Sequence, residues 1–456
     1  MQIGNCKLKI VNQRMKACAG LCRKTIAPLV FFGAVAILAS EASAKVYLDI
    51  NNPGGRRLPI AVPSFIVLEG ADPAGAASEM AAVIAGDLKF SGFFEPVPAE
   101  KFIEDPRKKA LTREEIHFPD WTAIGAEALV KGGIRMAGPR MEIEIRLFDA
   151  VQGRMIVGKK YTGEIKDARR IAHRFSNEVF KAFTGEDGIF ETQIAFVRRE
   201  KDHSQIFIAD YDGAGAAPVL SGKAINLKPR WHPDGKRLAY TSYKRRNPDM
   251  YEVEIASGRE KLLSGYAGLN LGGAWSPKGD TIALTLSRDG NSEIYALDPR
   301  TGGLSRLTQH SAIDVSPAWS PDGSRIAFVS DRSGSPQIYV MDASGENVRR
   351  VTFEGNYNTS PAWSPRGDKI AFTSRRGGAF QIAVVNPDGT DMKVLTNNGA
   401  SHEDPTWSPD GRYLVFSSRR NGRHQINIMP AQQGIAPLAV TSKGMDLTPA
   451  WSPRRP

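Results

Sequence analysis

Six hydrogen-bonding side chains recur along the second half of the chain at a spacing of 44 residues, each five positions before a tryptophan. If the repeat closes into a ring, we expect these side chains to surround one mouth of its central channel and to bind a partner there. The alternative is that Asn and Asp simply suit loop geometry. We expect no packing role, so that a substitution changes stability by at most about 0.5 kcal/mol. The six are Asn226, Asn270, Asp314, Asn358, His402 and Asp446.

A second repeated position, six residues after the start of the second strand of each repeat, is mostly basic. Strand reversal would place it on the same face, further from the axis. A polar mouth with a basic margin predicts a docking surface for an acidic protein, although arginine can also merely keep an edge soluble. Because interleaved aromatic residues are missing, we do not expect nucleic-acid binding. The position holds Glu200, Lys244, Arg288, Arg332, Arg376 and Arg420.

Catalytic motifs are missing from the sequence. It contains no Gly-x-Ser-x-Gly nucleophile elbow, no His-Glu-x-x-His zinc motif and no glycine-rich phosphate loop. We therefore expect a protein that is not an enzyme. The competing hypothesis is an exported hydrolase or ligand-binding propeller that uses the central channel.

Metal ligands are sparse. His402, Glu403 and Asp404 form the only dense polar triplet, and a solvated loop explains them better than a metal site. A weaker hypothesis is calcium at Asp314 and Asp446, assisted by the amides of the same ring, because calcium prefers oxygen ligands. Otherwise we expect no metal and no cofactor.

The elements that position these residues follow from one repeat. In five of six copies a Trp-Ser/His-Pro-x-Gly segment is followed by a short apolar run; in the sixth, Arg455 replaces the glycine, and successive tryptophans are 44 residues apart. The tryptophans predict packing between repeats rather than a cofactor site. They are Trp231, Trp275, Trp319, Trp363, Trp407 and Trp451.

Each repeat predicts four short strands. In one copy the first is Pro317 to Ser320, and a turn at Pro321-Asp322-Gly323 leads to Ile326–Ser330. This second strand is apolar on both faces, so it is sandwiched between sheets. Strands at Gln337–Asp342 and Val348–Thr352 complete the copy. Four strands per 44-residue repeat indicate a β-propeller blade.

The two ends of the repeat array are complementary. The first copy of the second strand, at Ile194, precedes the first repeat tryptophan, and the last copy stops soon after Trp451. We therefore expect one C-terminal strand to complete the blade that begins with three strands near Ile194. This arrangement predicts a six-bladed β-propeller spanning residues 186–456 with 1+3 strand closure.

Residues 45–185 lack the repeat and predict a separate two-layer α/β domain. Apolar spacing favours helices over 76–90 and 167–183, with Gly185 ending the second. Alternation favours a hairpin of strands 141–150 and 155–161. A further helix is expected over 121–130, leading into a strand over 129–134.

Residues 1–44 have the three-part pattern of a secretory signal peptide: a basic start, an apolar run and Ala42-Ser43-Ala44. The run of 13 apolar residues is short compared with the roughly 20 that span a bilayer. We expect cleavage after Ala44, no membrane insertion and a mature chain without thiols. The net charge of +11 then falls to +6, which indicates no particular partner. All three cysteines lie in this segment: Cys6, Cys18 and Cys22.

A small α/β domain containing Val46 to Ile50 and Gly125 to Gly132, followed by six Trp-Ser-Pro-x-Gly blades, resembles the TolB family of the Tol-Pal cell-envelope system. The resemblance implies a periplasmic protein of Gram-negative bacteria. It would link TolA of the inner membrane to the outer-membrane lipoprotein Pal, for outer-membrane integrity and constriction at cell division. Pal would dock over the channel, and we expect a monomer. The TolA-binding arm would comprise Lys45, Val46, Tyr47, Leu48, Asp49 and Ile50, continuing to about Asn52.

Overall fold

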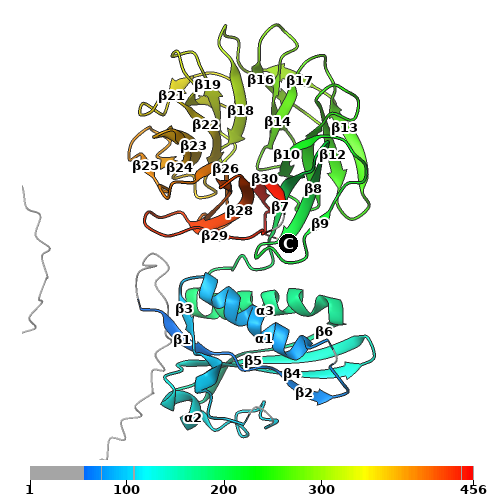
Figure 1. Cartoon of the computed structure of the whole chain (residues 1–456), viewed down its shortest axis with the longest axis vertical. Helices are drawn as coiled ribbons and strands as arrows, with labels where there is room; N and C mark the ends of the chain where they lie inside the picture. The colour runs from blue at the N-terminus through cyan, green and yellow to red at the C-terminus, as the bar shows by residue number, and fades with distance from the viewer. Residues whose placement is uncertain (1–55, 73, 106–107, 443, 455–456) are drawn as a thin grey trace, which may run out of the picture. The chain divides into compact units, whose positions relative to one another are not determined.

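The computed structural model describes residues 56–72, 74–105, 108–442 and 444–454 (Figure 1). All of them belong to one compact unit of the chain. The expectations for the signal peptide, the three cysteines and the N-terminal arm lie outside these residues. None of the helices in the described part of the chain combines the length and the apolar composition that crossing a membrane requires.

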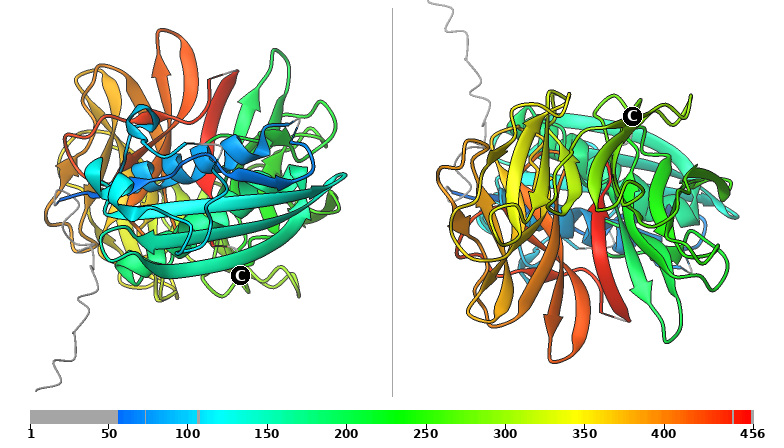
Figure 2. Two further views of the ribbon diagram at one scale, coloured as in Figure 1. Left: turned by 90° about the horizontal axis from the view of Figure 1, so that it is seen from below. Right: turned by 90° about the horizontal axis from the view of Figure 1, so that it is seen from above.

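The N-terminal domain contains a six-stranded sheet. Five of its strands pair in the order β3-β1-β4-β5-β6, and the sixth, β2, also pairs with β4. Figure 1 shows α1 and α3 together on one face of this sheet, and the long strands curve together (Figure 2). The predicted two-layer α/β architecture is confirmed. The strands are β1 (Leu58–Ala61), β2 (Ile66–Glu69), β3 (Phe94–Pro96), β4 (Ala128–Ala137), β5 (Arg140–Asp149) and β6 (Arg154–Glu164), and the helices are α1 (Ala76–Phe90), η1 (Ala99–Lys101), α2 (Phe118–Ala123), η2 (Ile165–Asp167) and α3 (Ala168–Thr184).

The helix predicted over 121–130 is wrong. The structure has the short helix α2 over Phe118–Ala123, with Pro119 in its first turn, where proline is tolerated. Gly125 then takes a φ of 84°, which a helix cannot continue. Leu129 and Val130 belong to β4, where their burial reflects a central strand rather than a helix face.

Six four-stranded antiparallel sheets surround a common axis (Figure 1), so the predicted six-bladed propeller is confirmed. The first four blades are β10 (Asn226–Trp231), β11 (Arg237–Ser242), β12 (Asp249–Glu254), β13 (Arg259–Ser264); β14 (Asn270–Trp275), β15 (Ile282–Leu286), β16 (Glu293–Leu297), β17 (Leu304–Arg306); β18 (Asp314–Trp319), β19 (Arg325–Ser330), β20 (Gln337–Asp342), β21 (Arg349–Arg350); and β22 (Asn358–Trp363), β23 (Ile370–Arg376), β24 (Ala379–Val385), β25 (Lys393–Val394).

The remaining two blades include the one that closes the ring. Strand β30 pairs antiparallel with β7, and Met445 lies opposite Arg199 while Trp451 lies opposite Ile194. The predicted 1+3 closure is therefore confirmed. These blades are β26 (Ser401–Trp407), β27 (Tyr413–Arg420), β28 (Arg423–Pro430), β29 (Leu438–Ala439); and β30 (Met445–Trp451), β7 (Gln193–Arg199), β8 (Ser204–Asp210), β9 (Ala217–Pro218).

Three of the repeat tryptophans join neighbouring blades, as predicted. Trp319 Nε1 donates to the carbonyl of Ala274 at 3.0 Å, and Trp407 Nε1 donates to that of Ala362 at 2.9 Å. Because Trp231 makes the same bond to Ala450, the contact also crosses the closing blade. The other three tryptophans differ. Trp363 Nε1 donates to the Gly367 carbonyl of its own blade, Trp451 Nε1 donates to Thr192 Oγ1, and Trp275 Nε1 has no partner among the described residues.

One hydrophobic core joins the α/β layer to the closing part of the propeller. It includes α1 and α3 side chains together with Phe196 of β7, Val415 of β27 and Trp451 of β30. The Tyr413 hydroxyl donates to the Ser91 carbonyl at 3.0 Å. The two helices therefore pack on the blades that meet where the ring closes.

Candidate functional site

The six polar residues lie at one end of the inner strands, as predicted, but their environment differs from the prediction. All six begin an inner strand or follow its first residue, and all six are buried. They are at most 5% exposed, so the expectation that they have no packing role is wrong. Buried polar groups need hydrogen-bond partners, and the partners show what these side chains do.

The asparagine side chains form hydrogen bonds with the loop that leads into their own blade. Asn358 Nδ2 donates to Gln337 Oε1 at 2.7 Å and to the Glu354 carbonyl at 2.9 Å. Asn270 accepts from the Ser264 hydroxyl at 2.6 Å and donates to the Tyr266 carbonyl at 2.8 Å. These side chains therefore hold the mouth loops in place from beneath.

The two aspartates pair with arginines. Asp446 receives two hydrogen bonds from Arg198, at 2.8 and 3.0 Å, and Asp314 receives one from Arg332 at 2.8 Å. Burial raises the pKa of Asp314, although Ser330 and Arg332 oppose this change. Because each carboxylate already faces a guanidinium, the structure does not favour the calcium site that we considered at these positions.

His402 is the histidine of the same set. Its Nε2 lies 2.8 Å from Asn398 Oδ1, and its ring is 1% exposed. Burial lowers the pKa of His402 to about 4. The ring is therefore neutral at neutral pH and takes the place that an asparagine amide has in three other blades.

We expect His402 to make the protein less stable as the pH falls from 6.5 towards 4. In this window the unfolded chain binds a proton on the imidazole but the folded chain does not, so stability is lost on acidification. Between pH 7 and pH 5 the loss should be about 2 kcal/mol. Urea unfolding of the wild type and of His402→Asn at both pH values measures it. The variant should lose less stability than the wild type, and the exposed control Gln432→Asn, which changes no titratable group, should match the wild type. Equal pH dependence in all three proteins would contradict the prediction.

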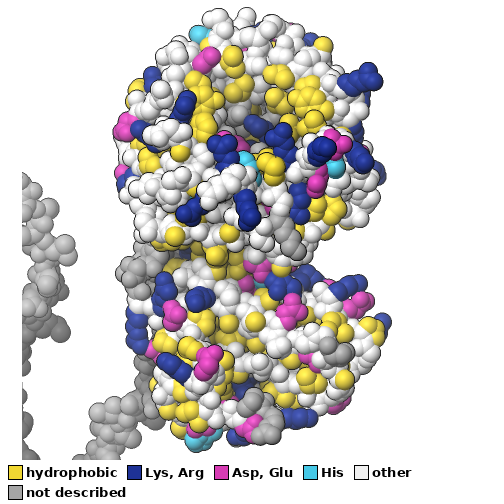
Figure 3. Space-filling view, viewed as in Figure 1, with side chains coloured by type: hydrophobic (Ala, Val, Ile, Leu, Met, Phe, Trp, Pro, Cys, Tyr) yellow, Lys and Arg dark blue, Asp and Glu magenta, His cyan; other side chains and the backbone are white. Residues whose placement is uncertain are grey.

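The basic positions lie at the same end of the blades, as the Arg332–Asp314 pair shows. Arg376 is partly exposed and lies 3.7 Å from Glu354, and Arg288 covers the ring of Tyr266. Lys244 pairs with Glu260. Arg420, at the end of β27, is exposed. Most of these cations are thus held by neighbours but still reach solvent. Figure 3 shows hydrophobic and basic side chains bordering a hollow on one face of the propeller.

Sequence reasoning missed an apolar set beside the buried polar one. The residue immediately before each polar position is a large hydrophobic residue in five of the six blades. Four of these are unusually exposed for their type, and Leu269 is half-buried. The 44-residue spacing that revealed the polar set could also have revealed this one. We call these four exposed residues the apolar collar: Ile225 (44% exposed), Ile313 (50%), Tyr357 (37%) and Met445 (38%).

The inner strands carry a shared backbone distortion two residues after each polar position. The pairing register with the second strand shifts there in all six blades, which is the mark of a β-bulge. Ser360 Oγ donates to Asp404 Oδ1 at 2.7 Å, so bulges of neighbouring blades touch. Positive φ values at side-chain-bearing residues are uncommon. They occur here at Lys228 (51°), Ser316 (56°), Ser360 (53°), Asp404 (55°) and Thr448 (45°), with Gly272 (66°) in the sixth blade.

One inner strand breaks the sixfold pattern. Arg230 stands where four other blades have alanine and one has Thr406. Burial lowers the pKa of Arg230, and the negative charge of Asp404, two blades away around the ring, opposes this change. The arginine makes this inner strand chemically different from those of the other five blades.

Two family models match the chain. The model described as "TolB beta propeller domain" matches residues 180–455, and the model described as "TolB amino-terminal domain" matches residues 46–156. The chain belongs to the TolB family. The resemblance seen in the sequence is confirmed.

Named relatives of this TolB-family chain agree. It is 40% identical over 219 residues to the Tol-Pal system protein TolB of Desulfosudis oleivorans, covering 48% of this chain and 50% of that protein. It is 43% identical over 253 residues to the protein of the same name from Syntrophus aciditrophicus, covering 53% and 56%. The chain thus spans about half the length of the curated relatives it matches.

A solved structure covers more of the chain. The crystal structure of TolB from Acinetobacter baumannii superimposes with a TM-score of 0.75 at 29% sequence identity, covering 88% of this chain and 98% of that one. The match includes both the α/β layer and the propeller, and it supports the fold described above.

Proposed function

We propose that this TolB-family protein is a non-enzymatic periplasmic adaptor of the Tol-Pal system. It binds a Pal-type lipoprotein at the channel mouth and TolA through its N-terminal arm, and it serves outer-membrane integrity and constriction at cell division. Family membership supports the system, because the relatives are named Tol-Pal system protein TolB. The observation that carries the docking site is the apolar collar, because it leaves four large hydrophobic side chains exposed at one mouth.

The collar and its surroundings have the composition of a protein–protein interface. Exposed apolar side chains supply the area that is removed from water on binding, and a polar, charged rim supplies selectivity. The buried polar residues beneath, such as Asn270 and Asn358, then act by keeping the collar loops in one conformation. Pre-ordered loops lose less entropy on binding. The arginines of the margin favour a partner with an acidic surface.

The arm is proposed to act separately from the mouth. It comprises Lys45 to about Asn52, outside the described residues, and it precedes β1. The described blades are built from residues 193–451, so we expect removal of the arm to leave the mouth unchanged.

Deletion of residues 45–52 is expected to abolish TolA binding and to leave Pal binding within about twofold of the wild type, because the mouth is built from blade residues that the deletion does not remove. Calorimetric titration of the mature chain and of the deletion variant with purified Pal and with purified TolA measures both. Alanine substitution of exposed residues in the β5–β6 turn, such as Val151→Ala, is the matched control. Failure of the mature chain to bind either protein would overturn the proposed function. Equal loss of both partners in the deletion variant would show that the arm and the mouth are not separate.

A further inference from the structure

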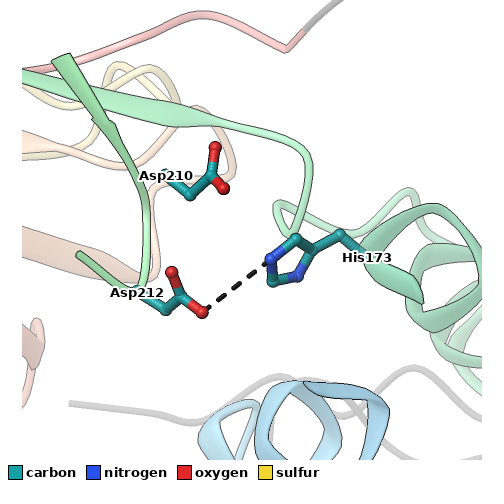
Figure 4. Close-up of side chains that lie close together, drawn as sticks. All are labelled: His173, Asp210 and Asp212. Carbon is teal, nitrogen blue, oxygen red and sulfur yellow. Dashed lines mark ion pairs between the residues drawn. The ribbon is translucent and has the colours of Figure 1, made fainter. Parts of the chain in front are cut away.

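Three potential metal ligands converge where α3 meets the propeller. His173 projects from α3, Asp210 is the last residue of β8, and Asp212 lies on the turn that follows (Figure 4). One ligand atom from each lies within 4.8 Å of the other two. They come from two separate parts of the fold, so the cluster exists only when both parts are packed together.

The imidazole of His173 is held as in a metal site. Its side chain is 2% exposed, and Nδ1 lies 2.8 Å from Asp87 Oδ2. The Tyr211 hydroxyl donates to the other Asp87 oxygen at 2.6 Å. A carboxylate that accepts from Nδ1 fixes the ring orientation and places the lone pair on Nε2, as it does behind many metal-bound histidines.

Nε2 of His173 has no hydrogen-bond partner among the described residues. Its nearest acidic oxygen, Asp212 Oδ2, lies at 3.8 Å, which is too long for a hydrogen bond (Figure 4). A buried ring nitrogen without a partner carries a free-energy cost, and it usually points to a function or to a missing ligand.

We propose that His173 Nε2, Asp210 and Asp212 bind one divalent first-row transition metal, with Zn²⁺ as the best match. An imidazole with two carboxylates suits zinc rather than calcium or magnesium, which prefer oxygen ligands alone. Two ligand atoms that each lie about 2 Å from one metal are at most about 4 Å apart. The three ligand atoms lie within 4.8 Å of one another, so metal binding requires them to approach by up to about 1 Å. A cavity of about 330 Å³ is lined by Asp212, one of the three proposed ligands, together with Asp87 and Tyr211.

Arg169 competes with the metal for one ligand. Its guanidinium pairs with Asp212 Oδ2 and also, at 3.4 Å, with Glu79 Oε1. Metal binding requires Arg169 to turn fully to Glu79. Removing this positive charge should therefore strengthen metal binding, whereas it would weaken a purely structural salt-bridge cluster.

The metal would fasten the α/β layer to the propeller. His173 belongs to the helix that packs on the sheet, whereas Asp210 and Asp212 belong to the closing blade. A ligand that binds only the folded, assembled form raises the midpoint of thermal unfolding.

Zinc titration of the mature, tag-free chain in chelator-free buffer tests the proposal, with calorimetry and thermal unfolding as readouts. We expect one Zn²⁺ per chain and a higher melting temperature. Asp210→Asn and His173→Gln should each weaken binding by about tenfold or more, and Arg169→Gln should strengthen it. The control His203→Gln removes another histidine paired with one aspartate, Asp202, and should bind as the wild type does.

Either of two results would overturn the proposal: no binding at about 100 μM Zn²⁺, or binding that Asp210→Asn leaves unchanged. Asp210→Asn keeps the fold testable if His173→Gln does not fold. None of these readouts depends on Pal or TolA, so the outcome is independent of the proposed function.

Discussion

A chain that ends before Leu447 is expected to lose cooperative unfolding and to aggregate. The deletion removes most of β30, which pairs with β7 from Met445 to Trp451. It also removes Trp451, which is 7% exposed in the core that joins the helices to the propeller. The inner edge of β7 would then present unpaired backbone groups, and open strand edges associate with one another.

Calorimetric melting and light scattering compare the truncated chain with the wild type. A chain that ends at Pro453 is the matched control, because it keeps the whole of β30 and the bond from Gln193 to Ser452 Oγ. The control should melt within a few degrees of the wild type, as expected for loss of about 1 kcal/mol or less. An undisturbed melting transition in the shorter chain would refute the importance of the closing strand.

Replacing the apolar collar is expected to weaken Pal binding at least about 100-fold. Ile225→Ser, Ile313→Ser, Tyr357→Ser and Met445→Ser together remove four exposed hydrophobic side chains at one mouth. Central apolar anchors each contribute about 1 kcal/mol or more to a protein interface. Because the side chains are exposed, the melting temperature should change little.

Two comparisons make the collar experiment specific. Ile103→Ser with Val151→Ser removes equally exposed hydrophobic residues from the α/β layer and should leave Pal binding unchanged. Arg288→Glu with Arg420→Glu should mainly slow association and alter its salt dependence. If the collar variant binds Pal normally and a change in the turn Pro321-Asp322-Gly323 abolishes binding, Pal docks on the opposite face.

The buried polar residues should not be used to test the interface. Substituting Asp314, Asn358 and His402 together with bulky residues would leave several buried partners unsatisfied, each at a cost of about 1–3 kcal/mol. The resulting loss of binding would report unfolding of the mouth loops. This reverses the expectation from the sequence that such changes spare stability.

The propeller could be predicted from sequence because its signals are local and repeated. Each 44-residue repeat contains its own turn of the Trp-Ser-Pro-x-Gly type and its own second strand that is apolar on both faces. The spacing of these features was therefore enough to predict the number of blades and the way the ring closes. Burial of the polar set could not be predicted in this way. It depends on partners such as Gln337 and Arg332, whose side chains reach Asn358 and Asp314 only after the strands pair.

The His173 cluster was beyond sequence reasoning for a different reason. Neither Asp210 nor Asp212 lies in a motif with His173, and α3 meets the turn after β8 only through tertiary packing. The helix itself was foreseen from its apolar spacing and from Gly185, which ends it at a φ of 76°. The sequence of α3 did not indicate that His173 would be a ligand, because a single histidine between apolar residues resembles an ordinary core position.

The closing strand also sets the order in which the molecule can be completed. A chain is synthesised from its N-terminus, so β7, β8 and β9 are complete long before β30, the strand that pairs with β7. The bond from Gln193 to Ser452 joins residues 259 positions apart, and such distant pairing forms slowly. During that interval the helices α1 and α3, which are already available, can shield β7 through Phe196 and its neighbours. Burial of Phe196 in the core shared with the helices would thus not depend on β30, whereas pairing of the β7 edge would.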